Sequence, residues 1–208
     1  MSEQLLSYAL TTVQRVKDRL AITGANFDTL IQRLINSATY FIESETNRHF
    51  AETTYTDEVY SIYGAKQDMV FLKNAPVSAI TSAQYRAGTP SNPAWTNFTA
   101  DEYELVEDGK SGIVKLYGLA GRGINALRFT YTAGYKINFT NAGDMVTHTL
   151  PADITDLCER LVIRWFKRRE SEGKTSEAFD GGQINWQSEL TNEDKETIAR
   201  YRRLPAFL

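Results

Sequence analysis

The side chains that most often carry catalysis are few in this 208-residue chain. Its two histidines, His49 and His148, stand without a nearby partner motif, so neither is predicted to act as a catalytic base. Its single cysteine, Cys158, falls on an apolar helical stripe, where a thiol behaves as a small hydrophobic group rather than as a nucleophile. The sequence therefore favours structural roles for all three residues.

Motifs of nucleophilic catalysis, phosphate binding and zinc binding are also missing from the sequence. It contains no GxSxG, Walker loop or HExxH. The glycines of 118–123 superficially resemble a phosphate loop, but predicted strands flank them, and without a helix N-terminus there is no fan of N–H groups to hold phosphate. The acidic pairs Asp101-Glu102 and Glu107-Asp108 flank predicted turns, where acidic residues are common. We therefore predict no enzyme, no metal site and no cofactor.

Composition describes an ordinary globular protein, with 42% hydrophobic and 24% charged residues. No run approaches the roughly 18 apolar residues of a membrane span, and the first residues lack the basic and apolar regions of a secretory signal. We expect a cytosolic protein without an internal disulfide. A net charge of −3 argues against a dedicated nucleic-acid coat.

Helical periodicity begins near the N-terminus. Thr11 or Thr12 is placed to cap a first helix, which Thr23-Gly24 ends. Asn26 or Asp28 then starts a longer helix, in which apolar residues recur at helical spacing along one stripe. This stripe predicts that the second helix packs on another element.

Helical periodicity returns toward the C-terminus. Pro151 suits the first turn of a third helix, and Lys167-Arg168-Arg169 suit its negative C-terminal end. The polar stretch 170–187 is expected to be a mobile loop. Thr191 and Asp194 then form a variant of the capping box, which predicts a short final helix.

The middle of the chain reads as strands, because Thr, Tyr, Val and Ile alternate there with polar residues between glycines, asparagines and prolines. The clearest hairpin signal is the stretch 107–112, with Leu105-Val106 before it and Ile113-Val114 after it. About six short strands are expected, in a small antiparallel sheet that is rolled or sandwiched.

These patterns together predict an α+β fold. A helical bundle of about four helices comes from residues 1–51 and 150–208. A small antiparallel β-sheet domain, residues 52–149, is inserted between its halves.

The C-terminal tail is the oddest feature of the sequence. The final helix has two obvious apolar anchors, Ile198 and Tyr201, and so short a helix cannot hold itself together in water. It must dock on its own domain or on a neighbouring chain; the enrichment of arginine and aromatic residues at interfaces favours the neighbour. The predicted docking residues are Trp186, Leu190, Ile198, Arg200, Tyr201, Arg202, Arg203 and Phe207.

Four short motifs occur along the chain, and their order is more informative than any one of them. They are Leu-x-x-x-Pro-Val-x-x-Ile at 72–80, Tyr-Thr-Ala-Gly-Tyr at 131–135, Leu-Pro-Ala-Asp-Ile at 150–154 and Leu-x(10)-Tyr-Arg-Arg at 190–203. In this order they resemble the head-to-tail connector (adaptor) proteins of long-tailed bacteriophages and prophages.

This resemblance implies a structural virion protein at the head–tail interface, made in the host bacterial cytoplasm. It implies a ring of about twelve copies, whose C-terminal segments dock on the portal protein. The opposite side of the ring receives a stopper or tail-completion protein. Double-stranded DNA passes through the central channel without specific binding, which a near-neutral to acidic net charge suits. The resemblance implies no membrane partner.

Other functions stay open on the sequence alone. One is another virion joint, a stopper or tail-completion protein, although these lack the long helix pair. A second is a glycan- or peptide-binding module, with a stacking platform made of Tyr55, Tyr60, Tyr63, Trp95 and Tyr117. Aromatic residues in a small sheet are more often core or cross-strand pairs. An enzyme that uses acidic pairs is a third.

Overall fold

A computed structural model describes residues 4–63, 68–89, 91–92, 94–118, 123–141, 143–169, 176–179, 182–185 and 190–203. Their contacts divide them into two compact units. The described residues within 1–48 and 137–204 form one unit, which we call the helical unit. Those within 49–136 form the other, the β-rich unit.

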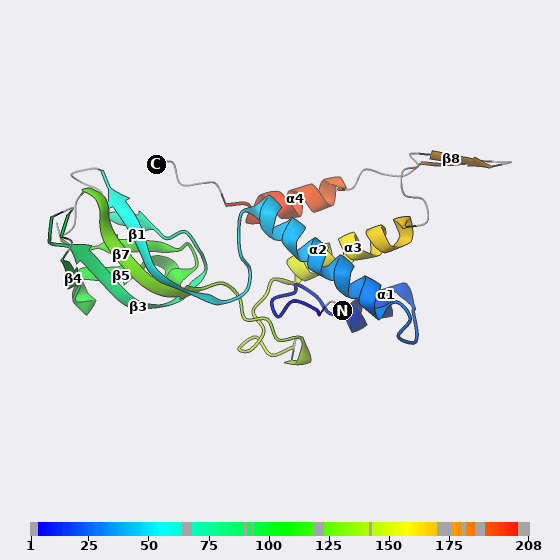
Figure 1. The fold of residues 1–208 in the computed structure, drawn as a ribbon, viewed down its shortest axis with the longest axis horizontal. Helices are drawn as coiled ribbons and strands as arrows, with labels where there is room; N and C mark the ends of the chain where they lie inside the picture. The colour runs from blue at the N-terminus through cyan, green and yellow to red at the C-terminus, as the bar shows by residue number, and fades with distance from the viewer. Residues whose placement is uncertain are drawn as a thin grey trace. The chain divides into compact units, whose positions relative to one another are not determined.

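Four α helices are described in the helical unit (Figure 1): α1 (Val13–Leu20), α2 (Asp28–Thr46), α3 (Ala152–Arg168) and α4 (Asn192–Tyr201). The apolar stripes of α2 and α3 face each other, and their fully buried side chains include Ile35 and Ile42 of α2 with Leu157 and Leu161 of α3. Helices α1 and α4 each pack on this pair.

Local capping explains where these helices begin. The Thr12 hydroxyl accepts a hydrogen bond from the Arg15 backbone at the start of α1. Thr191 and Asp194 form a reciprocal capping box at the start of α4. Pro151 directly precedes α3, where its missing N–H costs nothing. These three predicted helix starts are confirmed.

The β-rich unit contains two small sheets in its described residues, and every strand pair in them is antiparallel. One sheet has the order β1-β7-β3-β4, and the other has the order β2-β6-β5. The strands are β1 (Thr53–Ile62), β2 (Met69–Phe71), β3 (Val77–Arg86), β4 (Trp95–Asn97), β5 (Tyr103–Leu105), β6 (Ile113–Leu116) and β7 (Gly123–Ala133). With the four helices, they confirm the predicted α+β fold.

The core of the β-rich unit follows the two-residue period of β7. Leu127, Phe129 and Tyr131 alternate along this central strand and are fully buried. Val114 of β6 and Leu72 belong to the same buried cluster. The apolar residues of both sheets therefore share one core.

The hairpin predicted around Glu107–Gly112 is confirmed, because β5 and β6 pair on either side of it. Glu107, Asp108 and Gly109 all have positive φ in this turn. A Cβ on Gly109 would lie 2.0 Å from the Val77 carbonyl oxygen, so only glycine fits there.

One expectation about the polar stretch 170–187 is wrong in part. A mobile loop was expected throughout, but the structure has two paired antiparallel strands, β8 (Ser176–Phe179) and β9 (Gly182–Asn185). In the sequence, Asp180-Gly181 separates the two, and an Asp-Gly pair between short strands is a strong hairpin signal. That local signal outweighs the overall polarity of the stretch.

Candidate interface around the C-terminal helix

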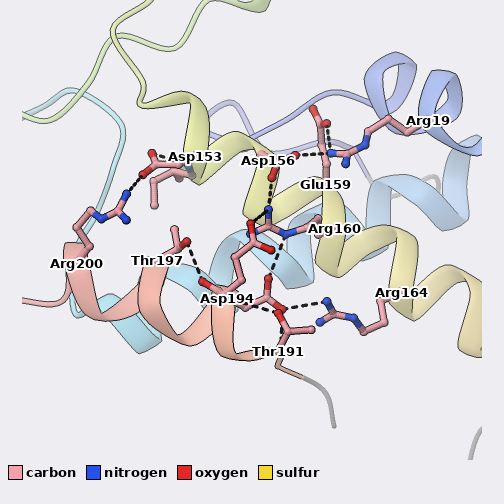
Figure 2. Close-up of polar contacts among 12 residues, drawn as sticks. Arg19, Asp153, Asp156, Glu159, Arg160, Arg164, Thr191, Asp194, Thr197 and Arg200 are labelled. Atoms are coloured by element: carbon pink, nitrogen blue, oxygen red, sulfur yellow. Dashed lines mark hydrogen bonds and ion pairs between the residues drawn. The ribbon is translucent and has the colours of Figure 1, made fainter. Parts of the chain in front are cut away.

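Helix α4 lies on α2 and α3 of its own helical unit. Its buried face is small: Ile198 is 4% exposed and Thr197 is 6% exposed. Since so little apolar surface is covered, polar contacts at the two ends of α4 must supply much of its attachment. Figure 2 shows these contacts along one edge of α3.

The first turn of α4 is held by a buried carboxylate, Asp194, which is completely inaccessible to solvent. Its Oδ1 lies 3.1 Å from Arg160 Nε, and its Oδ2 lies 2.9 Å from Arg164 Nη2 (Figure 2). The Thr191 N–H donates to the same carboxylate at 3.0 Å. Both oxygens are thus paired, as a buried charge requires.

The pKa of Asp194 reflects this competition between burial and pairing. Burial alone would raise the pKa of the carboxyl group. Hydrogen bonds from the Thr191 backbone and hydroxyl, together with the Arg164 guanidinium, outweigh it and hold the pKa below its ordinary value. The carboxylate is therefore ionised at neutral pH, and its charge contributes to seating α4.

The charged edge continues from α4 across α3 to α1. Arg160 also pairs with Asp156 one turn earlier on α3 and with Glu193 at 3.1 Å. Asp156 in turn lies 2.7 Å from Arg19 Nη1 (Figure 2). One side of α3 therefore carries acidic and basic side chains that pair with residues of α1 and of α4.

Glu159 anchors the α1 side of this edge and is 4% exposed. It accepts hydrogen bonds from Thr11 Oγ1 at 2.9 Å, Arg15 Nε at 2.7 Å and Arg19 Nη1 at 2.9 Å. The hydrogen bond to Glu159 is the main cause that raises the pKa of Arg19. Three donors thus compensate the burial of this carboxylate.

The last turn of α4 is held by contacts nearer the surface. Asp153 accepts from the Tyr201 hydroxyl at 2.8 Å and from Arg200 Nη1 at 3.0 Å. Arg202 Nη2 lies 3.1 Å from Glu45 Oε2, and the Arg203 N–H donates to the Thr46 carbonyl at 2.8 Å. The arginine tips remain largely solvated, because the Arg200 and Arg202 side chains are 65% and 52% exposed.

The structure places the predicted docking residues in three different environments. Ile198 lies in the core of its own unit. Arg200 and Arg202 are exposed, whereas Leu190, Tyr201 and Arg203 are half-buried. Trp186 and Phe207 lie outside the described residues.

Sequence reasoning missed the carboxylate at the centre of the contact between α3 and α4. Asp194 was expected only as a capping residue, and its buried pairing with Arg160 and Arg164 was not foreseen. A partial signal exists, because these arginines are four residues apart and so share one face of α3. Their acidic partner comes from another helix, which no local pattern reveals.

The residues first weighed for catalysis have structural surroundings. Burial raises the pKa of the Cys158 thiol to about 12, so it is not ionised at neutral pH. His148 Nδ1 accepts a hydrogen bond from the Asn138 N–H at 3.0 Å, and burial together with Arg15 lowers the pKa of its imidazole. The thiol is thus a neutral buried group, and the imidazole serves as an acceptor for a backbone N–H.

Metal-binding and membrane-spanning features were sought in the described part of the chain. No group of three or more His, Cys, Asp or Glu side chains in that part is arranged to hold a metal ion. No helix in it is long and apolar enough to cross a membrane.

Two of the aromatic residues considered as a glycan platform, Tyr55 and Tyr60, pack in or against the core of the β-rich unit. Tyr60 is buried, and its hydroxyl donates to Glu58 Oε2 at 2.6 Å. Tyr55 stacks on the buried Tyr131, with ring centroids 5.4 Å apart. At least these two of the five rings serve the core, which weakens the case for a sugar-binding face.

A protein family and two solved structures resemble this chain over nearly its whole length. A sequence profile of the family described as "Head completion protein" matches residues 9–204. A search of curated proteins finds no match. Among solved structures, one described as "Neck of empty GTA particle computed with C6 symmetry" shares 17% identity at a TM-score of 0.60, covering 100% of this chain and 96% of that chain.

A second solved structure, described as "Virion of native gene transfer agent (GTA) particle", shares 18% identity at a TM-score of 0.59. This match covers 100% of the present chain and 96% of the chain in that structure. At such identities the two matches establish a common fold.

Proposed function

We propose a place for this chain in a virion from one premise: the chain belongs to the head completion protein family, whose profile spans residues 9–204. That membership confirms the resemblance drawn from the sequence. It also makes the chain a structural virion protein rather than an enzyme. The finer proposal is a head–tail connector, a ring between the portal and the stopper or tail-completion protein in the neck of a phage-like particle.

The observation that carries this proposal is the agreement of family and fold along the chain. The structure titled as a particle neck covers 100% of this chain, so both the helical and the β-rich parts have counterparts there. That neck was computed with C6 symmetry. Six-fold symmetry admits rings whose copy number is a multiple of six, and about twelve copies is one such number.

Charge supports a passive role toward DNA. The chain carries 23 basic and 26 acidic residues, so a ring of it has no overall excess of phosphate-neutralising groups. Tight binding to the backbone would slow the passage of DNA and depends on such groups. We therefore assign the channel a conducting role without specific DNA binding.

We assign portal docking to the C-terminal segment. Some of its described residues hold α4 on its own unit, and others are exposed to a partner. Ile198 holds α4 on its own unit, which fixes where the segment points. The guanidinium groups of Arg200, at the end of α4, and of Arg202, just after it, are largely exposed and can reach a partner. Arginine at the edge of an interface forms bidentate bonds to carboxylates, so acidic groups on the portal are the expected partners.

Substitution tests this assignment better than truncation does. Removing α4 would leave Arg160 and Arg164 without Asp194 and would expose the surface around Ile198. Arg200→Ala combined with Arg202→Ala removes two exposed side chains and their surface contacts, but it keeps the buried contacts of Asp194 and Ile198. Lys195→Ala is the matched control, because it removes an exposed cation from the same helix.

The measurement is co-purification with the portal protein, with the mass of the complex determined in the native state. The double variant is expected to bind the portal at least about ten-fold more weakly, because charged interface contacts commonly contribute this much. The Lys195→Ala variant is expected to bind as the unmodified chain does. Equal binding by all three proteins would overturn the docking assignment, and no binding by the unmodified chain would overturn the proposed function.

A further inference from the structure

The small sheet β2-β6-β5 has apolar side chains on the side that meets solvent. Its inner side buries Val70 and Val114 in the core of the β-rich unit. Successive residues of a strand point to opposite sides of a sheet, so Met69 and Phe71 of β2 face outward. Phe71 is 56% exposed and Met69 is 41% exposed. Two large apolar side chains of a short strand therefore lie in water.

The neighbouring strand β6 extends this apolar side. In the register of the two strands, Ile113 lies opposite Phe71, and Lys115 lies opposite Met69. Tyr117 follows Lys115 by two residues and is exposed, and the Lys115 ammonium lies 5.0 Å from the centre of the Tyr117 ring. We call this surface, which consists of Met69, Phe71, Ile113, Lys115 and Tyr117, the apolar face.

The larger sheet of the same unit shows what a solvated side usually contains. Its central strand β7 directs Arg128, Thr130 and Thr132 outward, between the buried residues of the core. This alternation is usual when one side of an antiparallel sheet meets water. The apolar face departs from it, and exposed apolar clusters of this kind usually mark contacts with other proteins.

A second exposed apolar pair lies in the helical unit, in the segment between β7 and α3 (yellow-green in Figure 1). Met145 and Val146 are 78% and 71% exposed. The turn that displays them is held by Asp144, whose carboxylate accepts hydrogen bonds from the Val146 N–H at 2.9 Å and the Thr147 hydroxyl at 3.0 Å. We call residues 144–147 the apolar turn.

Opposite charges accompany the two surfaces. Hydrogen bonds from the backbone and hydroxyl groups of the apolar turn hold the pKa of Asp144 below its ordinary value, so this carboxylate is charged at neutral pH. Residues 137–150 contain no lysine or arginine. On the apolar face, Lys115 supplies a positive charge, and Glu104 opposite it already accepts a hydrogen bond from the Tyr117 hydroxyl. Lys115 can therefore pair with Asp144 where the two surfaces meet.

We propose that the apolar turn of one copy docks on the apolar face of the neighbouring copy in the ring. This inference rests on the proposed function, because it requires a ring. A head-to-tail ring contact joins two unlike surfaces of the same protein, and every copy must carry both. The apolar turn and the apolar face meet that requirement, since they lie in different units and bear opposite charges beside their apolar side chains.

Photo-crosslinking identifies what the apolar turn touches. The full-length chain, carrying the photoreactive amino acid benzoylphenylalanine in place of Met145, is assembled on the portal and irradiated. A second preparation carries it in place of Ile124, which is 70% exposed but belongs to neither surface. The expected products are chain-to-chain dimers from position 145, with linked peptides from β2 or β6 and a yield at least about five-fold above that from position 124.

Substitution tests whether the contact is needed for assembly. Met145→Ser combined with Val146→Ser is expected to lower the yield of portal-bound ring at least about ten-fold, because the apolar area that the contact buries is lost. Ile124→Ser is the matched control and should assemble normally. Urea denaturation of the isolated double variant should match that of the unmodified chain, because both side chains already lie in water and Val146 holds the turn through its backbone N–H.

Each outcome supports or overturns the contact. Cross-links from position 145 within one chain, to the portal or to another part of the neighbouring copy would overturn it while leaving the ring in place. Normal ring yield in the double variant would also overturn it. If the unmodified chain forms no ring on the portal, the proposed function fails and this contact fails with it.

Discussion

Two regions of this chain hold their parts together by different means. In the β-rich unit, the central strand β7 buries Leu127, Phe129 and Tyr131 in a shared apolar core. In the helical unit, α4 buries one large apolar side chain, Ile198, beside a completely buried carboxylate, Asp194. The first attachment depends on area removed from water and the second on charge pairing. The second attachment should therefore weaken in acid, where Asp194 becomes protonated.

The largest effect is expected in the apolar core. Phe129→Ala removes a fully buried ring from the middle of β7 and should lower the free energy of unfolding by about 3–5 kcal/mol. Urea denaturation measures this. Ile124→Ala on the same strand is the control, because Ile124 is 70% exposed and its loss should change stability by less than about 0.5 kcal/mol. Similar losses from both variants would contradict this assignment of the core.

The next largest effect is expected at the charged seat of α4. Asp194→Asn keeps the shape of the side chain but leaves Arg160 and Arg164 without their buried anion, and it should lower the free energy of unfolding by about 3 kcal/mol. Glu193→Gln is the control: this neighbouring acid also pairs with Arg160 but is 71% exposed, so its loss should cost less than about 1 kcal/mol.

The single cysteine shows which unit opens in each variant. Cys158 on α3 is fully buried, so its thiol should react with a labelling reagent only when the helical unit opens. Asp194→Asn should speed labelling roughly a hundred-fold. Phe129→Ala, in the other unit, should leave the rate within about two-fold. Equal acceleration by both variants would mean that the two units unfold together.

Acid should narrow the difference between the unmodified chain and the Asp194→Asn variant. The folded-state pKa of Asp194 lies below its unfolded value of about 3.9. Its contribution is therefore complete above about pH 4 and is lost as the pH falls through the folded-state pKa. Urea midpoints of the two proteins, measured from pH 7 downward, should draw together once the pH falls below about 4. Parallel curves would show that the charge of Asp194 does not stabilise the fold.

The smallest effect is expected at the outer end of α4. Arg200→Ala removes a pair with Asp153 in which the arginine side chain is 65% exposed, so stability should fall by less than about 1 kcal/mol. The urea midpoint checks this. A loss comparable to that of Asp194→Asn would mean that Arg200 belongs to the seat of α4 and is unsuited to the docking role proposed for it.

Much of the fold could be predicted because local chemistry specifies it. Helix starts are marked by side chains that accept hydrogen bonds from N–H groups of the first turn, as at Thr12 and the Thr191–Asp194 pair. Pro151 marks another start because it has no N–H that would need a partner there. The turn before β6 was readable because glycine is required at Gly109. Such signals act within a few residues, so they survive in the sequence. The β8–β9 hairpin carried a signal of the same kind, which the polarity of its surroundings hid.

The polar contacts between the helices were harder to predict, because the residues that pair come from distant parts of the chain. Glu159 accepts hydrogen bonds from Thr11, Arg15 and Arg19. No local sequence pattern around Glu159 predicts these three donors. For the same reason the sequence left open whether the last helix docks on its own domain or on a neighbour. The burial of Ile198 places α4 on its own unit and leaves the exposed arginines as candidates for docking.

The most direct test of the central claim is a native mass measurement of this chain mixed with its portal protein. The account predicts a complex in which several copies of the chain, in a multiple of six, are bound to one portal ring. A portal that carries no copies, or a complex whose copy number is unrelated to that symmetry, would contradict it.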